Sequence, residues 1–117
     1  MALAQDLQVY KAMKQLLTFI VKERTTFPKS YRAVGQDLVT QALRCLTLIQ
    51  QANMSKATRA RYLFDLTAEY GTLGTLLEVC VELRLFGKAA TDRAAILTTN
   101  VGRQITGWRE SSTKPEP

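Results

Sequence analysis

Apolar side chains recur every three or four residues in four separate stretches of the chain, which is the spacing of one face of a helix. The first stretch shows the pattern plainly, because its opposite face is polar. Its apolar stripe consists of Val9, Met13, Leu16 and Ile20. No stretch alternates apolar and polar residues convincingly, as a β-strand would. The four stripes predict helices over about residues 4–24, 29–52, 55–86 and 89–110.

Residues that interrupt helices separate these stretches. Pro28 restricts the backbone of Phe27 to extended conformations, so the first helix ends there and the second begins at Pro28 or just after it. Gly87 is well placed to end the third helix. The polar, proline-containing residues 111–117 are expected to form a flexible tail. Four amphipathic helices with short connections predict one all-α domain, residues 1–110, folded as an antiparallel up-down-up-down four-helix bundle.

The third helix carries a second apolar face, about half a turn away from the stripe that fills the core. An exposed face of this kind is typical of a protein interface, and we expect it to mediate self-association. Gly71 and Gly74 fit this hypothesis, because each costs about 1 kcal/mol relative to alanine and would let a neighbouring helix approach closely. The alternative is that the last helix or the tail covers the face. The expected oligomer interface consists of Phe64, Ala68, Gly71, Thr75, Val79 and Phe86.

The chain is basic, with 16 Lys and Arg against 10 Asp and Glu and a net charge of +6. This balance favours an acidic partner, with RNA or DNA first among the candidates. The alternative is a solvated basic surface that only keeps the protein soluble. Three of the cations, Lys56, Arg59 and Arg61, gather at the start of the third helix, where the macrodipole disfavours positive charge. That placement suggests a binding role for them.

The aromatic residues fall mostly in the core stripes, so contacts to the phosphate backbone are expected in place of base stacking. The basic residues are spread along the four helices, without one compact tract. The candidate nucleic-acid and partner-binding residues are Lys11, Lys14, Lys22, Lys29, Arg32, Lys56, Arg59, Arg61, Arg93 and Arg103.

The sequence offers no constellation for catalysis. It contains no histidine, no glycine-rich phosphate loop, no CxxC pair and no GxSxG motif. Glu78 and Glu82 are spaced as paired carboxylates of a di-iron bundle are, but such a site also needs histidines. We therefore expect a non-enzymatic protein with no catalytic residue, metal, cofactor or small-molecule substrate.

Cys45 and Cys80 both lie in strongly apolar helical stretches. This position is typical of buried small hydrophobic residues in a reducing compartment, and a disulfide is the alternative. The N-terminus lacks the basic and apolar regions of a signal peptide, and no apolar run approaches about 18 residues. The expected location is the cytoplasm, with no membrane partner.

Two phrases of the sequence carry a family resemblance. Residues 27–30 read Phe-Pro-Lys-Ser and lead into a helix that opens with Tyr-Arg-Ala, and residues 101–108 read Val-Gly-Arg-Gln-Ile-Thr-Gly-Trp. With their spacing over residues 5–110, they resemble the accessory variability determinant proteins of diversity-generating retroelements. That family is a branch of a larger group of four-helix proteins that includes those encoded in ribosomal RNA intervening sequences.

The resemblance implies a pentameric, barrel-shaped homo-oligomer of four-helix protomers with a basic surface. It implies association with the retroelement's reverse transcriptase and with structured RNA or complementary DNA, in support of mutagenic retrohoming. It also implies a bacterial or phage-encoded protein without a catalytic centre. Two alternatives stay open: a helical protein–protein adaptor, and a ribosome-associated protein of the intervening-sequence type with no retroelement role.

Overall fold

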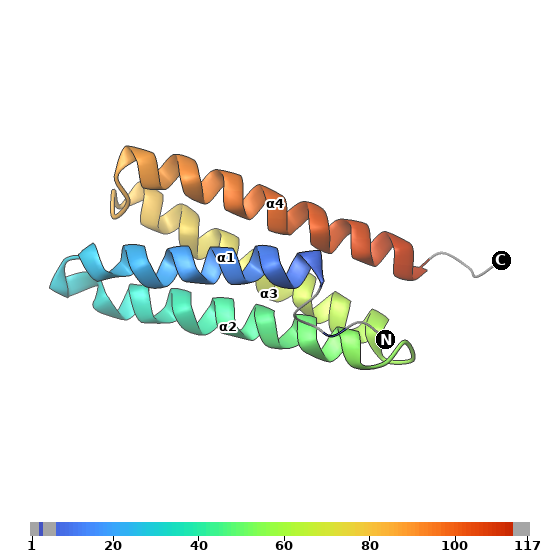
Figure 1. Ribbon diagram of the computed structural model, residues 1–117. Coiled ribbons are helices and arrows are strands. Elements are labelled where there is room, and N and C mark those ends of the chain that lie inside the picture. The colour runs from blue at the N-terminus through green and yellow to red at the C-terminus, as the bar shows by residue number, and fades with distance from the viewer. Residues whose placement is uncertain (1–2, 4–6, 114–117) are drawn as a thin grey trace.

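The computed structural model describes Leu3 and residues 7–113, and it confirms an all-helical fold. Two short 3₁₀ turns, η2 (Arg24–Thr26) and η3 (Lys29–Tyr31), connect the first two α-helices, and no strand occurs among the described residues. Figure 1 shows the helices running side by side along one long axis. The four α-helices are α1 (Gln8–Glu23), α2 (Arg32–Met54), α3 (Arg59–Glu82) and α4 (Lys88–Thr113).

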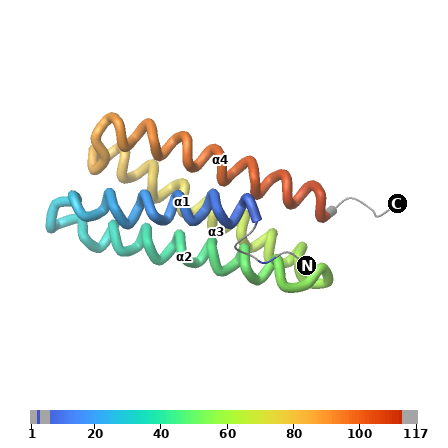
Figure 2. Tube along the Cα trace, in the orientation of Figure 1, coloured from blue at the N-terminus to red at the C-terminus, as the bar shows by residue number. Residues whose placement is uncertain are grey.

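Each helix packs against its neighbours in the chain, and α1 also packs against α4, which closes the bundle. The diagonal pairs, α1 with α3 and α2 with α4, do not share such contacts within the described residues. The trace in Figure 2 reverses direction at each connection, so neighbouring helices are antiparallel. The predicted up-down-up-down four-helix bundle is confirmed.

The core is formed by the apolar stripes that the sequence shows. None of α1, α2 and α3 has a side-chain hydrogen bond at its N-cap or an acidic residue in its first turn. The helices therefore depend on burial of their apolar faces more than on capping, as is usual in bundles. Fully buried positions include Met13, Leu16, Ile20, Leu38, Cys45, Ile49, Leu66, Leu73, Cys80 and Val101.

The connection between α1 and α2 follows the proline rule. Phe27 is extended, with φ −64° and ψ 138°, and its side chain is buried. α2 begins at Arg32, three residues after the predicted bound at residue 29, because the 3₁₀ turn comes first. Gly35 allows close packing at this corner, since a Cβ there would lie 3.2 Å from Arg24 Cβ and 3.4 Å from Phe27 Cδ2, so a side chain would need its neighbours to shift slightly.

The end of α3 differs from the prediction. The helix stops at Glu82, four residues earlier than predicted, and Arg84 takes the left-handed conformation with φ 58°. The amide of Leu85 donates to the Cys80 carbonyl at 2.9 Å and that of Arg84 to the Val81 carbonyl at 3.0 Å, the two bonds of a Schellman motif. The prediction that Gly87 ends α3 is therefore wrong.

Gly87 instead precedes α4, and its carbonyl accepts the Thr91 amide at 2.9 Å. The other predicted boundaries also shift. α1 begins at Gln8, since Leu7 is extended, and α3 begins at Arg59, after a turn in which the Ser55 hydroxyl accepts the Ala57 amide at 3.2 Å. α4 continues to Thr113, so part of the predicted tail is helical, and residues 114–117 lie outside the described residues.

Replacing Arg84 with glycine should raise the free energy of unfolding by about 1 kcal/mol, because a non-glycine residue in the left-handed conformation costs roughly 1–2 kcal/mol and glycine avoids it at a smaller entropic cost. Urea denaturation of Arg84→Gly would measure this. The control is Leu83→Gly one residue earlier, where φ is −80° and glycine should lower the stability. A destabilised Arg84→Gly protein would contradict the Schellman assignment.

None of the described helices combines the length and the hydrophobicity that crossing a membrane requires.

Candidate nucleic-acid interface

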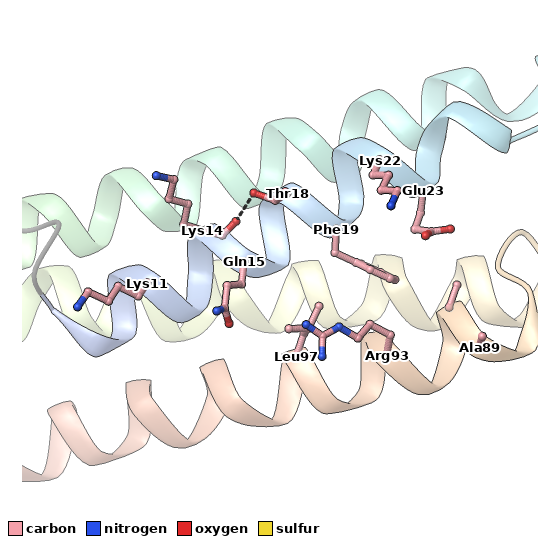
Figure 3. A pocket seen from close by; sticks show the side chains of 11 residues that line it. Lys11, Lys14, Gln15, Thr18, Phe19, Lys22, Glu23, Ala89, Arg93 and Leu97 are labelled. Atoms are coloured by element: carbon pink, nitrogen blue, oxygen red, sulfur yellow. Dashed lines mark hydrogen bonds between the residues drawn. The ribbon is translucent and has the colours of Figure 1, made fainter.

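A groove of about 720 Å³ runs between α1 and α4, and four of the ten candidate cations line it. Its floor is apolar, formed by the half-buried Phe19 and the buried Leu97. Figure 3 shows Gln15 and Phe19 pointing from α1 toward α4, with Arg93 lying along α4 opposite them. The four cations that line the groove are Lys11, Lys14, Lys22 and Arg93.

The spacing of the three lysines explains why they share this groove. Lys11, Lys14 and Lys22 are separated by three and eight residues, about one and about two helical turns, so they lie on the same side of α1. From Lys11 to Lys22 the helix advances about 16 Å. Arg93 joins them only because α4 is the neighbour of α1 in the bundle. The sequence shows the lysine stripe, and only the fold adds the arginine.

The electrostatics of the groove leave its cations available to a ligand. All four side chains are exposed, and none makes a side-chain hydrogen bond or an ion pair among the described residues. Among the residues that the structure describes, Glu23 is the one carboxylate that lines the groove. A concave surface with several unpaired positive charges attracts anions. The distance of about 16 Å from Lys11 to Lys22 matches the length of roughly five nucleotides of one duplex strand, at 3.4 Å per nucleotide.

Arg59 lies at the end of the bundle where α2 connects to α3, and contacts within the chain hold its side chain in place. Its Nε donates to the Ala52 carbonyl at 2.9 Å, and its guanidinium lies 5.7 Å from the centre of the Trp108 ring. Ala52 is in the last turn of α2, where carbonyls have no partner within the helix. This bond gives a structural reason for a cation at the start of α3.

The remaining candidate cations do not join the groove. Lys29 and Arg32 are exposed at the turn between α1 and α2. Lys56 and Arg61 lie at the far end, near the α2–α3 connection, and Arg103 borders a separate hollow beside Trp108. The ten candidates therefore divide into one groove and positions at both ends of the bundle.

The second apolar face of α3 is open to solvent over most of its length. Phe64 is 72% exposed and Val79 is 38% exposed. Ala68, Gly71 and Thr75 are also exposed, so α4 does not cover this face. A Cβ added at Gly71 or Gly74 would meet nothing within 4 Å, so the described part of the chain supplies no close approach that would explain the glycines.

Phe86 does not belong to that face, and its assignment to an exposed interface is wrong. It lies beyond the end of α3, is only 6% exposed, and packs against Phe19 and Phe27 at centroid distances of 5.8 and 5.6 Å. The helical spacing placed it with Val79 only as long as α3 was assumed to continue to residue 86. The three rings instead close one end of the core.

A polar network between α2 and α3 was not apparent from the sequence. Gln41, only 6% exposed, donates to the Glu69 carboxylate at 2.6 Å and to the Glu69 carbonyl at 2.8 Å. Arg44 donates to the Gln41 side-chain oxygen at 3.2 Å and lies 3.5 Å from the Glu69 carboxylate. These bonds satisfy a buried amide and fix the register of the two helices. No local pattern in the sequence pairs Gln41 with Glu69, because they lie 28 residues apart.

Both cysteines are free and buried, as expected. Burial, together with the negative charge of Glu69, raises the pKa of the Cys45 thiol to about 12, and burial also raises the pKa of Cys80. Both thiols therefore stay protonated at neutral pH and are poor nucleophiles. Among the described residues, no three cysteine, aspartate or glutamate side chains lie close enough to hold a metal ion.

Comparison of the sequence with protein-family models and with curated proteins finds no match.

Proposed function

We propose that this protein binds nucleic acid without catalysis, and that the phosphate backbone lies in the groove between α1 and α4. The observation that carries the proposal is that Lys11, Lys14, Lys22 and Arg93 all line one groove and form no ion pair among the described residues. Lysine and arginine contacts to phosphates supply most of the affinity of binding that does not depend on sequence.

The biological setting of the proposal comes from the resemblance of residues 27–30 and 101–108. In that setting, the protein is an accessory factor of a diversity-generating retroelement. Its partners are the element's reverse transcriptase and the structured RNA or complementary DNA, and it supports mutagenic retrohoming in a bacterial or phage-infected cytoplasm.

Self-association is the second part of the proposal. The exposed α3 face that includes Phe64 and Val79 supports it, because large exposed apolar side chains on one helix face favour association. A ring of protomers, a pentamer by resemblance, would repeat the basic groove and add its weak contacts together. Sedimentation should then report a mass several times the 13.1 kDa of one chain. A monomer at all concentrations would contradict this part alone.

A protein–protein adaptor is the second candidate function, favoured by the same exposed face of α3. It predicts no measurable affinity for structured RNA at moderate salt. One experiment that measures binding to structured RNA therefore distinguishes the two candidate functions.

Binding to a structured RNA hairpin should weaken steeply as salt rises. If each protomer contacts four phosphates, the logarithm of the affinity should fall against the logarithm of salt with a slope of about −2.8 to −3.6. The affinity should then drop roughly 50- to 150-fold between 50 and 200 mM salt. Fluorescence anisotropy with a labelled hairpin measures the slope, and a slope near zero would overturn the phosphate-backbone proposal.

A further inference from the structure

A second groove, of about 420 Å³, lies between α3 and α4 and differs in character from the basic one. Most of its lining is small or apolar, with Thr91 and Thr98 also present, and Val81 in it is 39% exposed. Since α4 is flanked by α1 on one side and α3 on the other, the two grooves lie on different sides of α4. The apolar and small residues that line this groove include Gly74, Leu77, Val81, Ala94 and Ala95.

The short side chains explain why the groove is open. A Cβ built on Gly74 would meet nothing within 4 Å, and Ala95 is exposed on the facing helix. Glycine within a helix costs about 1 kcal/mol relative to alanine. No part of the described chain approaches Gly74 closely enough to account for that cost. A group from outside the chain that packs against Gly74 would account for it.

Two carboxylates border the groove. Glu78 and Glu82 lie one helical turn apart on α3 and are both exposed. Neither forms an ion pair among the described residues. Like charges at this spacing repel each other, which destabilises a helix slightly. In a chain of net charge +6, this is a local negative site beside an apolar surface, and it suits a cationic, apolar partner.

We propose that the α3/α4 groove is the docking site of a basic amphipathic helix from a partner protein. Apolar side chains of that helix would fill the space over Gly74 and Ala95, and Lys or Arg residues one turn apart would pair with Glu78 and Glu82. Nucleic acid does not fit here, because the carboxylates repel phosphate and no Lys or Arg lines the groove among the described residues. The site stands apart from the proposed nucleic-acid groove.

A second copy of this chain is a poorer fit than a separate partner. The basic stripe of α1 would have to supply the helix, but Gln15 and Thr18 lie between its lysines. These polar side chains would leave the apolar walls of the α3/α4 groove unfilled. The partner helix therefore needs leucine-like side chains on the face that its lysines border.

A model peptide tests the proposal on the full chain. The probe is a labelled helical peptide of about 18 residues, with leucines on one face and lysines on both flanks. The matched peptide carries glutamates in place of the lysines. The basic peptide should bind the unaltered protein, and the Glu78→Lys/Glu82→Lys variant should bind it at least about tenfold more weakly. The acidic peptide should bind the unaltered protein weakly. Its affinity should be no higher than the affinity of the Glu78→Lys/Glu82→Lys variant for the basic peptide.

Two further variants keep the test decisive. Asp37→Lys/Asp65→Lys changes the net charge equally at exposed positions outside the groove and should retain the affinity. Ala95→Trp should fill the groove and weaken binding to a similar extent as the charge reversal. Equal binding by both charge variants, or full binding by Ala95→Trp with its helicity intact, would overturn the proposal. Sedimentation showing that Ala95→Trp dissociates a self-assembled protein would overturn it too, because a second copy would then occupy the groove.

Discussion

Neutralising the α1/α4 groove should lower the affinity for structured RNA by roughly 100-fold at 100 mM salt and remove most of its salt dependence. The variant replaces Lys11, Lys14, Lys22 and Arg93 with glutamine. The physical reason is that each lost phosphate contact lowers the magnitude of the salt slope by about 1. Glutamine has nearly the helix propensity of lysine and arginine, so the bundle should stay folded.

The matched control removes four charges elsewhere, by glutamine at Lys29, Arg32, Arg61 and Arg103, all exposed and all outside the groove. Both variants have the same net charge, so a general attraction of RNA to a basic protein would weaken equally in the two. We expect the control to bind within about threefold of the unaltered protein and to keep most of the salt slope. Equal losses in both variants would show that the groove is not the binding surface.

Shortening Phe86 to alanine should lower the free energy of unfolding by about 3–5 kcal/mol, which is the usual cost of removing a buried aromatic ring. Phe86 is 6% exposed and contacts two other rings, Phe19 and Phe27. Its removal would leave a cavity where the α1–α2 turn meets the end of α3. Urea denaturation measures the loss, and a marginal protein would already be partly unfolded at room temperature.

Phe64→Ala removes the same atoms from a side chain that is 72% exposed, and it is the control for Phe86→Ala. The stability of the monomer should change by no more than about 0.5 kcal/mol. Sedimentation of the same variant tests the proposed assembly, since the mass should fall toward that of one chain if the α3 face is the interface. A large loss of monomer stability in Phe64→Ala would mean that this face is covered within the chain.

Some helix boundaries could be predicted from the sequence, and others could not. Pro28 acts on the residue beside it, so the break at Phe27 could be predicted. The end of α3 could not, because Arg84 adopts a conformation that a glycine usually takes. The rule therefore pointed to Gly87, three residues too late. The same late helix end placed Phe86 wrongly on the exposed face of α3.

The two grooves show a related difference for the candidate sites. The lysine stripe of α1 and the pair Glu78 and Glu82 follow from helical spacing within one element. Arg93 and Ala95 complete these surfaces from α4, and no local pattern relates them to α1 or α3. Arg59 is the opposite case, because its bond to Ala52 and its contact with Trp108 give a structural role to a cation that suggested binding.

The sequence by itself determined that this protein is four amphipathic helices with buried apolar stripes, a basic surface and buried cysteines. These features depend on periodicity and composition, which act over a few residues. The tertiary structure alone decided which residues are neighbours across helices: Arg93 beside the α1 lysines, Phe86 inside the core, and Gln41 against Glu69. The physical reason is that packing between helices depends on how their side chains fit together, and residues 28 or more positions apart leave no periodic trace of that contact.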